Sequence, residues 1–365
     1  MKILFVLESY YPNIGGVETL FKSLADALSA RDHQVMVITT HPGGKVKRRE
    51  VLGNVSIRRY NFINRYFFTL FAFIPVLLNA GKYDLIQTTS YNAGVPAFLG
   101  GLMNRKKTII TFHEYWNRLW FELPYFSRFS LWLHYLFEKM LAIIPFYKFI
   151  AVSESTRNNL IKGGVAAEKV EMIYNGIRYE EWQPVKKIEK ASIFQFVYFG
   201  RLGISKGINL LLDAVRILKE QGTDFELVLI IPPNPSDLYS LILQFIEEQE
   251  LSNHVKIMGH LLKSELIAVV GAADAVVIPS YSEGFCYSAV ESVALKKPIV
   301  SSGRGALPEV VSGKYIVLEK LDAVELSKAM QEAMRGNWKE KETRYFHLDD
   351  TVANYLDLYE KILNP

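Results

Sequence analysis

The sequence predicts two doubly wound α/β domains, each with a mostly parallel sheet covered by helices on both faces. At 365 residues the chain is long for one hydrophobic core, so two domains are the natural expectation. Short apolar segments alternate with longer helical patterns throughout. Because these segments are continuously apolar rather than alternating, they indicate strands buried on both faces of a parallel sheet.

The apolar segments fall into two series, one before residue 113 and one after residue 193. They are ILFVL (3–7), VMVIT (35–39), LIQT (85–88), TIITF (108–112), FQFVYFG (194–200), LVLII (227–231), AVVIP (275–279) and PIVSS (298–302). Repetition of strand and helix produces doubly wound domains. The polar segment between the series predicts a linker at 181–192, a first domain at 1–180 and a second at 193–348.

The last predicted element is a helix over residues 349–363. Val352, Tyr355 and Tyr359 recur there at helical spacing, and Asp349 is the candidate N-cap. The helical pattern by itself does not say where this helix docks.

Composition excludes several classes of protein. The net charge of +4 comes without a dense block of Lys and Arg, so we expect no nucleic-acid partner. The one cysteine, Cys286, allows neither an internal disulfide nor a cysteine-based metal site, and we expect no bound metal. A reducing, cytoplasmic location is the prediction. The longest apolar stretch, Tyr66–Ala80, contains a proline and is too short to span a bilayer.

Two facing domains of this kind would leave a cleft at the carboxyl ends of their strands, where open α/β sheets bind ligands. Gly15 and Gly16 follow the first strand and precede a helix expected to begin near Val17, so they can bring backbone N–H groups close to an anion. His113 ends the strand TIITF and can bind or exchange a proton with a substrate. A plain turn and a structural histidine are the alternatives.

Arg201 and Lys206 follow the strand FQFVYFG. A bidentate guanidinium and a mobile ammonium five residues apart suit a diphosphate. A solvated basic loop is the alternative interpretation.

Glu283 and Glu291 lie in the stretch SEGFCYSAVE, after the strand AVVIP. With a helix expected from Gly284 onward, the second carboxylate lies about 12 Å further along the helix than the first. That separation suits hydrogen bonds to hydroxyl groups at two parts of one elongated ligand. The alternative makes Glu283 a helix cap and Glu291 a surface residue.

These motifs together resemble the retaining glycosyltransferases of family 4, which have the two-domain GT-B fold of facing Rossmann-like domains. The resemblance rests on GGVE (15–18), FGRLGISKG (199–207) and EGFCYSAVE (283–291), with support from VSES (152–155), YNGI (174–177) and KPIVSSGRGALPEVV (297–311). It covers nearly the whole chain. It also implies that residues 349–365 pack on the first domain.

The resemblance implies a role for each matching position. Arg201 and Lys206 would hold the donor diphosphate near the backbone of Gly15 and Gly16, and His113 would lie by the sugar and the leaving phosphate. Glu291 would bind the donor ribose. The transferred sugar would be held by Glu283 and by backbone at Gly284, Phe285 and Cys286. The nucleobase would contact backbone at Met258, Gly259 and His260. The catalytic set would be His113, Arg201, Lys206 and Glu283.

The implied reaction is retaining, metal-independent transfer of a hexose from a UDP-, GDP- or ADP-sugar to an acceptor hydroxyl, without a permanently bound cofactor. A glycan, a lipid-linked sugar and a small glycoside all remain open as acceptors, in polysaccharide or glycolipid biosynthesis. A sugar-nucleotide 2-epimerase of the same fold and a non-catalytic nucleotide-sugar binding protein are the alternatives. Cys286 and Tyr287 stand where members of the family commonly have glycine and a small aliphatic residue, which leaves the donor sugar open.

Two segments of the first domain, 58–78 and 115–149, combine Arg and Lys with many aromatic residues. Such segments can lie in a membrane interface, which would place the protein peripherally on the inner face of a membrane. Helices packed on the sheet beside an aromatic acceptor pocket are the alternative.

Overall fold

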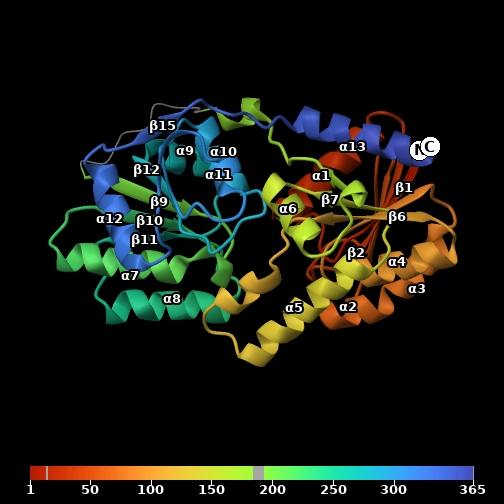
Figure 1. The fold of residues 1–365 in the computed structure, drawn as a ribbon, viewed down its shortest axis with the longest axis horizontal. Coiled ribbons are helices and arrows are strands. Elements are labelled where there is room, and N and C mark those ends of the chain that lie inside the picture. The colour runs from red at the N-terminus through yellow and green to blue at the C-terminus, as the bar shows by residue number, and fades with distance from the viewer. Residues whose placement is uncertain (14, 184–192, 365) are drawn as a thin grey trace. The chain divides into compact units, whose positions relative to one another are not determined.

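The structure is a computed structural model that describes residues 1–13, 15–183 and 193–364 (Figure 1). The chain divides into two compact units. Unit 1 comprises Met1–Phe121, Phe126–Gly176 and Phe346–Pro365, and unit 2 comprises Glu122–Tyr125 and Ile177–Tyr345. Of the linker expected at 181–192, residues 184–192 lie outside the described residues.

Unit 1 is built on an eight-stranded sheet of order β3-β4-β2-β1-β5-β6-β7-β8, in which all neighbouring strands are parallel except β3 and β4. Its strands are β1 (Lys2–Val6), β2 (Gln34–Thr40), β3 (Arg49–Leu52), β4 (Val55–Tyr60), β5 (Leu85–Thr89), β6 (Lys107–Phe112), β7 (Lys148–Ala151) and β8 (Val170–Met172). Its α-helices are α1 (Gly16–Ser29), α2 (Arg65–Phe71), α3 (Phe73–Ala80), α4 (Gly94–Met103), α5 (Arg128–Ile143), α6 (Glu154–Lys162) and α13 (Leu348–Leu363). Short 3-10 turns are η1 (Asn117–Glu122) and η2 (Ala167–Lys169).

Unit 2 has a seven-stranded sheet of order β11-β10-β9-β12-β13-β14-β15, parallel except for the edge pair β14 and β15. The strands are β9 (Gln195–Phe199), β10 (Glu226–Ile230), β11 (Val255–Met258), β12 (Ala275–Ile278), β13 (Ile299–Ser301), β14 (Gly313–Val317) and β15 (Lys339–Lys341). The helices are α7 (Ile208–Glu220), α8 (Ser236–Glu248), α9 (Lys263–Ala272), α10 (Tyr287–Ala294), α11 (Leu307–Val310) and α12 (Ala323–Met334), with 3-10 turns η3 (Tyr179–Trp182) and η4 (Ile204–Lys206). The predicted class, two doubly wound α/β domains, is confirmed.

The sheet of unit 1 carries helices on both faces because its strands are apolar on both sides. Ile3, Leu85 and Ile109 belong to a core shared with α1 and α13, whereas Leu4 and Ile86 pack in a core with α2, α3 and α4. Figure 1 shows the same arrangement, with α1 and α13 on one face of the sheet and α2 to α5 on the other.

The helix predicted over 349–363 is α13, and it forms part of this core. Tyr355 and Tyr359 are fully buried, and the Tyr359 hydroxyl donates a hydrogen bond to the side-chain oxygen of Gln87 in β5. The N-cap prediction was wrong: the helix begins after His347, so Asp349 lies inside its first turn.

The helices on the opposite face of this sheet expose many large apolar side chains. The outer α2–α5 face consists of the exposed residues Tyr66, Phe67, Leu70, Phe71, Ile74, Leu78, Leu99, Leu102, Met103, Phe129, Trp132, Leu133, Leu136, Met140 and Ile143. By contrast, none of the large apolar side chains of α1 and α13, all of which are described, is exposed. No helix within the described residues is long and apolar enough to cross a bilayer.

Candidate functional site

The sheet of unit 2 has a topological switch point between β9 and β12, because the chain leaves β9 toward β10 on one side and returns to β12 on the other. Ligands of open α/β sheets bind beyond the carboxyl ends of strands at such a point. The loop after β9 carries Arg201 and Lys206, and the loop after β12 leads to Glu283. The fold therefore brings these predicted residues to one edge of one sheet.

Lys206 and Glu283 form an ion pair across this switch point. The Lys206 Nζ lies 2.8 Å from both carboxylate oxygens of Glu283, and the Ser280 hydroxyl donates a third hydrogen bond, 2.7 Å long, to Oε1. The Glu283 side chain is 8% exposed and that of Lys206 is 24% exposed. Removing Lys206 would leave the buried Glu283 carboxylate without its cation, so the loss of this pair should destabilise the protein.

Backbone contacts fix the loops around this pair. The Tyr281 N–H donates to the Ser205 carbonyl at 2.8 Å, which joins the β12 loop to the β9 loop. The Ala306 N–H donates to the Glu283 carbonyl at 2.8 Å, which joins the β13 loop to the β12 loop. The loops after the adjacent strands β9, β12 and β13 are thus hydrogen-bonded to one another around Glu283.

Two glycines make this close approach possible. Gly207 has a φ of 69°, and a Cβ added there would lie 2.0 Å from the Pro279 carbonyl oxygen. Gly305 has a φ of 63°, and its Cβ would lie 2.2 Å from the Glu283 carbonyl oxygen. Both positions require glycine for its positive φ and for its missing side chain.

Arg201 lies differently from Lys206. Its side chain is exposed, and among the described residues it forms no ion pair. Its backbone is held, because the buried Tyr198 hydroxyl donates to the Arg201 carbonyl at 3.4 Å. Burial and the Glu283 carboxylate together raise the pKa of Tyr198, so this hydroxyl keeps its proton. The loop after β9 therefore presents an exposed guanidinium beside an ammonium that is already paired.

The helix after Glu283 starts later than predicted. α10 begins at Tyr287, because Cys286 has a φ of 71° in the left-handed region and stops the helix from extending back to Gly284. Glu283 is therefore neither in this helix nor its cap, and the predicted helical separation of the two glutamates does not apply. Gly284, Phe285 and Cys286 form a buried turn. The Cys286 thiol has its pKa raised by burial and by the Glu283 charge.

Glu291 lies within α10. Its side chain is partly buried, and burial raises its pKa to about 8, against which the Lys263 charge acts weakly. Lys263 is itself held by an ion pair with Glu181 and lies 5.0 Å over the Trp182 ring. Glu291 is thus not a fully exposed surface residue, which was the alternative. Met258 ends β11, and the next two residues, Gly259 and His260, are exposed.

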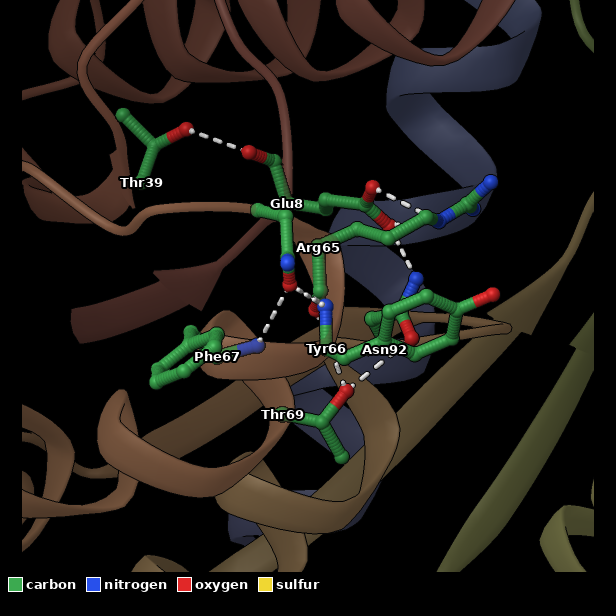
Figure 2. Close-up of polar contacts among 8 residues, drawn as sticks. Glu8, Thr39, Arg65, Tyr66, Phe67, Thr69 and Asn92 are labelled. Carbon is green, nitrogen blue, oxygen red and sulfur yellow. Dashed lines mark hydrogen bonds and ion pairs between the residues drawn. The ribbon is translucent and has the colours of Figure 1, made fainter.

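The sheet of unit 1 has its own switch point, between β1 and β5. Glu8 follows β1, and Asn92 follows β5. The Asn92 amide donates to a Glu8 carboxylate oxygen at 2.8 Å, and Arg65 at the start of α2 pairs with the same carboxylate at 3.3 Å (Figure 2). The Thr69 hydroxyl donates to the Asn92 oxygen at 3.0 Å. Two side chains of α2 thus contact the residues at this edge of the sheet.

The sequence interpretation missed Glu8 and Asn92. Glu8 directly follows the first predicted strand, so its position after a strand was a usable signal. Asn92 and Arg65 join it through contacts 84 and 57 residues apart, which no local pattern reveals.

The predicted residues of unit 1 lie along the same edge. Gly15 precedes α1 with extended backbone, and Gly16 is its first residue, one earlier than predicted. The His113 ring follows β6 and lies 6.4 Å from the Phe21 ring of α1. In unit 1 three buried side-chain atoms, Glu18 Oε2, Ser90 Oγ and Asn175 Oδ1, have no hydrogen-bond partner among the described residues. Such atoms are rare in folded proteins and mark places where a ligand or water binds.

Other surfaces do not coincide with these residues. A hollow of about 380 Å³ in unit 1 lies between β7, β8 and α13, where Lys148 pairs with Glu171 and Lys361 pairs with Asp357. It contains none of the predicted site residues. Within the described part of the chain, no three His, Cys, Asp or Glu side chains are grouped closely enough to hold a metal ion.

Two protein families match this chain in succession. Glycosyltransferase Family 4 matches residues 14–181, and Glycosyl transferases group 1 matches residues 180–346. The chain belongs to the group 1 glycosyltransferases. It is therefore a transferase enzyme of glycan biosynthesis, and its two Rossmann-like α/β units are those of the GT-B fold.

Curated relatives of this glycosyltransferase span most of its length at low identity. It is 22% identical over 344 residues to a phosphatidylinositol N-acetylglucosaminyltransferase chain of Arabidopsis thaliana, which covers 92% of this chain and 74% of that protein. It is 23% identical over 373 residues to the GPI3 chain of the Saccharomyces cerevisiae enzyme, which covers 97% of this chain and 79% of that protein.

Solved structures share its fold. The sucrose-phosphate synthase of Thermosynechococcus elongatus aligns with a TM-score of 0.82 and 19% identity, over 99% of this chain and 98% of that one. The Anabaena protein HepE, solved in complex with UDP and glucose, aligns with a TM-score of 0.71 and 20% identity, over 99% of this chain and 100% of that one.

Proposed function

We propose that this glycosyltransferase transfers a sugar, with retention of anomeric configuration and without a metal ion, from a nucleoside diphosphate sugar to an acceptor hydroxyl. The observation that carries the proposal is the cluster of Arg201, Lys206 and Glu283 at the switch point of unit 2. Two cations and one fixed carboxylate match the two parts of such a donor, the diphosphate and the polyhydroxylated sugar. HepE, which was solved with UDP and glucose, supports a donor of this class.

In this proposal Arg201 donates two hydrogen bonds to oxygens of the diphosphate. The Lys206 ammonium donates both to the Glu283 carboxylate and to a phosphate oxygen. Glu283 and the buried turn at Gly284, Phe285 and Cys286 then bind the hydroxyl groups of the sugar. Glu291 binds the ribose in this proposal, and backbone at Met258, Gly259 and His260 contacts the nucleobase. Gly15, Gly16 and His113 contact the phosphate and the sugar.

The chemical step needs no covalent nucleophile in this proposal. The bond between the anomeric carbon and the leaving phosphate oxygen breaks while the acceptor oxygen bonds to that carbon on the same face. The acceptor proton passes to the leaving phosphate, so the products are a glycoside and a nucleoside diphosphate. Arg201 and Lys206 stabilise the negative charge that grows on the phosphate, which is the contribution that preorganised positive groups make to transition states.

The acceptor binds unit 1 in this proposal. The Glu8 carboxylate accepts hydrogen bonds from acceptor hydroxyls beside Asn92, and the buried atoms without partners, such as Ser90 Oγ, supply further contacts. A glycan, a lipid-linked sugar and a small glycoside fit this chemistry. We propose a cytoplasmic location, peripheral to the inner face of a membrane.

A ligand panel tests the donor class. UDP-, GDP- and ADP-sugars are each added to the protein with and without EDTA, and the melting temperature is measured, because a ligand that binds the folded state raises it. We expect one nucleotide series to raise the melting temperature equally in both conditions. If no nucleotide sugar stabilises the protein, the proposal is wrong. If only the samples without EDTA respond, metal independence is wrong.

Product analysis separates transfer from the alternatives. With the preferred donor and a hydroxylated acceptor, NMR should show a glycoside with the anomeric configuration of the donor. Conversion of the donor to an epimer without any acceptor would identify a 2-epimerase instead. Tight donor binding with neither transfer nor slow donor hydrolysis would identify a binding protein.

A further inference from the structure

The outer α2–α5 face is continuous, because its helices pack side by side on one face of the sheet. α3 packs against α4, where a Cβ added at Gly100 would lie 2.5 Å from Val76. α4 meets α5 in the same way, where a Cβ added at Gly94 would lie 2.8 Å from Leu141. The exposed side chains of these helices consequently point away from the same sheet and form one surface.

α5 shows most clearly that this surface is built to be covered. Its inner side is buried through Leu131 and Leu141, as expected for a helix packed on a sheet. Its outer side exposes Phe129, Trp132 and Leu136, at the spacing of one helical face, and Ile143 is 77% exposed two turns later. A helix that is apolar on both sides is normally buried, and contiguous exposed apolar surface of this kind marks an interaction site.

The charged residues of the outer α2–α5 face indicate the kind of partner that it binds. Within α2, α3, α4 and α5 the one acidic residue is Glu138, and it is buried, where it accepts hydrogen bonds from the Trp116 and Asn117 N–H groups at 2.9 and 2.7 Å. The charged residues that these helices expose to solvent, Arg65 and Arg128, are basic. α1 and α13 on the opposite face carry exposed acids instead, such as Asp349 and Asp357.

We infer that the outer α2–α5 face docks on an anionic lipid bilayer. Exposed aromatic and aliphatic side chains can enter the headgroup and acyl boundary, while the exposed Arg128 meets anionic headgroups. No helix in the described part of the chain could cross the bilayer, so the face lies in the interface. A second copy of the chain is less suitable as the occupant, because its matching face would offer no exposed acid to pair with Arg128.

This inference deepens the proposed function, on which its last step rests, by naming the acceptor class. Arg65 both begins α2 and pairs with Glu8, so the carboxylate proposed to bind the acceptor borders the membrane-docking face (Figure 2). An acceptor presented there would be a lipid whose hydroxylated headgroup reaches Glu8 while its tails stay in the bilayer.

Vesicle co-sedimentation of the whole protein, without any nucleotide sugar, tests the docking. The probes are vesicles of phosphatidylcholine alone and vesicles with about one third phosphatidylglycerol. The wild type should sediment with the anionic vesicles, less with the neutral ones, and less again at high salt, because exposed charges are screened. Absence of binding to anionic vesicles, or dimerisation in solution that hides the face, would overturn the inference.

A pair of variants localises the contact. Leu70→Glu with Ile143→Glu places two acids on the outer α2–α5 face, and Ala353→Glu with Asn354→Glu places two on exposed positions of α13. The first variant should bind anionic vesicles about tenfold less than the wild type, and the second should bind about as well. Equal binding by both variants would refute this face as the contact. Donor stabilisation measured without vesicles reports the proposed function separately, so the two can fail independently, and it shows that both variants fold.

Discussion

In unit 1 the switch point lies between β1 and β5, and the Asn92 amide donates across it to Glu8. In unit 2 it lies between β9 and β12, and the Lys206 ammonium donates across it to Glu283. The two contacts have the same length, 2.8 Å, but different surroundings. The Glu283 side chain is 8% exposed, whereas the Glu8 side chain is 29% exposed.

The different exposure of Glu8 and Glu283 indicates that the two units suit different kinds of ligand. In unit 2 the loops are hydrogen-bonded to one another around Glu283, so the edge is preorganised and suits a ligand part that never varies, such as a diphosphate. In unit 1 buried atoms such as Ser90 Oγ and Asn175 Oδ1 lack partners within the described residues, so that edge can accept hydrogen bonds from outside. One fold type thus provides a closed site and an open one.

The largest expected effect tests the cations of unit 2. Arg201→Ala and Lys206→Ala should each lower kcat/KM about 100-fold, the scale of losing one group that stabilises an anionic transition state. Lys206→Ala should also lower the melting temperature, because it leaves the buried Glu283 carboxylate unpaired, whereas Arg201→Ala should not. Steady-state kinetics and thermal unfolding check this, with Lys320→Ala, an exposed lysine of the same unit, as the control. Near-normal turnover in both variants would reject the donor site.

The next effect tests how tightly the loops of unit 2 must pack. Gly207 and Gly222 both have a φ of 69°, but a Cβ at Gly222 would meet nothing within 4 Å, whereas one at Gly207 would clash with the Pro279 carbonyl. Gly207→Ala should therefore destabilise the protein by about 1–3 kcal/mol more than Gly222→Ala does. Thermal or denaturant unfolding of the two variants gives the difference. Equal losses would show that the backbone conformation alone matters and that the close approach does not.

A smaller effect tests the open edge of unit 1. Glu8→Gln and Asn92→Ala should raise the KM for the acceptor about tenfold, or about 1.4 kcal/mol, the net value of one hydrogen bond. Donor binding should stay unchanged, because neither Glu8 nor Asn92 is among the residues proposed to bind the donor. Acceptor titrations at saturating donor measure this, and Asp349→Asn, which removes an exposed carboxylate from α13, is the matched control. A change in donor affinity without a change in acceptor KM would reverse the assignment.

The smallest effect is the pH dependence of Glu291. Its pKa of about 8 lies above its ordinary value of 4.5, so between these values the folded state keeps a proton that the unfolded state has lost. The stability that Glu291 contributes is therefore fully present below about pH 4.5 and is lost as the pH rises through about 8. The slope should be less than about 1.4 kcal/mol per pH unit.

Glu291→Gln cannot titrate, so its free energy of unfolding should lack this slope. Denaturant unfolding of both proteins at several pH values isolates it, because all other titrating groups are common to the pair. Parallel pH profiles would mean that Glu291 is ionised in the folded state.

The main strands could be predicted because a parallel strand buried on both faces consists of consecutive apolar residues. β15 could not, since Lys339–Lys341 is polar and pairs only at the sheet edge. The start of α10 was misplaced because a single residue, Cys286, adopts a left-handed conformation that no periodicity records. Position after a strand placed Arg201 and Lys206 after β9 and Glu283 after β12, and these strands are adjacent in the sheet.

The pairing of Lys206 with Glu283 was beyond sequence patterns, because it joins residues 77 apart and depends on which strands are adjacent. The same holds for Glu8 and Asn92. Local patterns give each side chain a place along its own element, whereas the order of strands in the sheet decides which side chains meet.

The position of α13 has a consequence for synthesis. Unit 1 gains this helix only after the chain has passed through Ile177–Tyr345, so the face of its sheet that Tyr355 and Tyr359 cover stays bare while unit 2 is being made. Since domains generally fold as units during translation, unit 2 can finish first although it starts later. A chain whose synthesis stops before residue 348 would expose the apolar sheet face of unit 1 that α13 normally covers. Chaperones and proteases bind such exposed apolar surface.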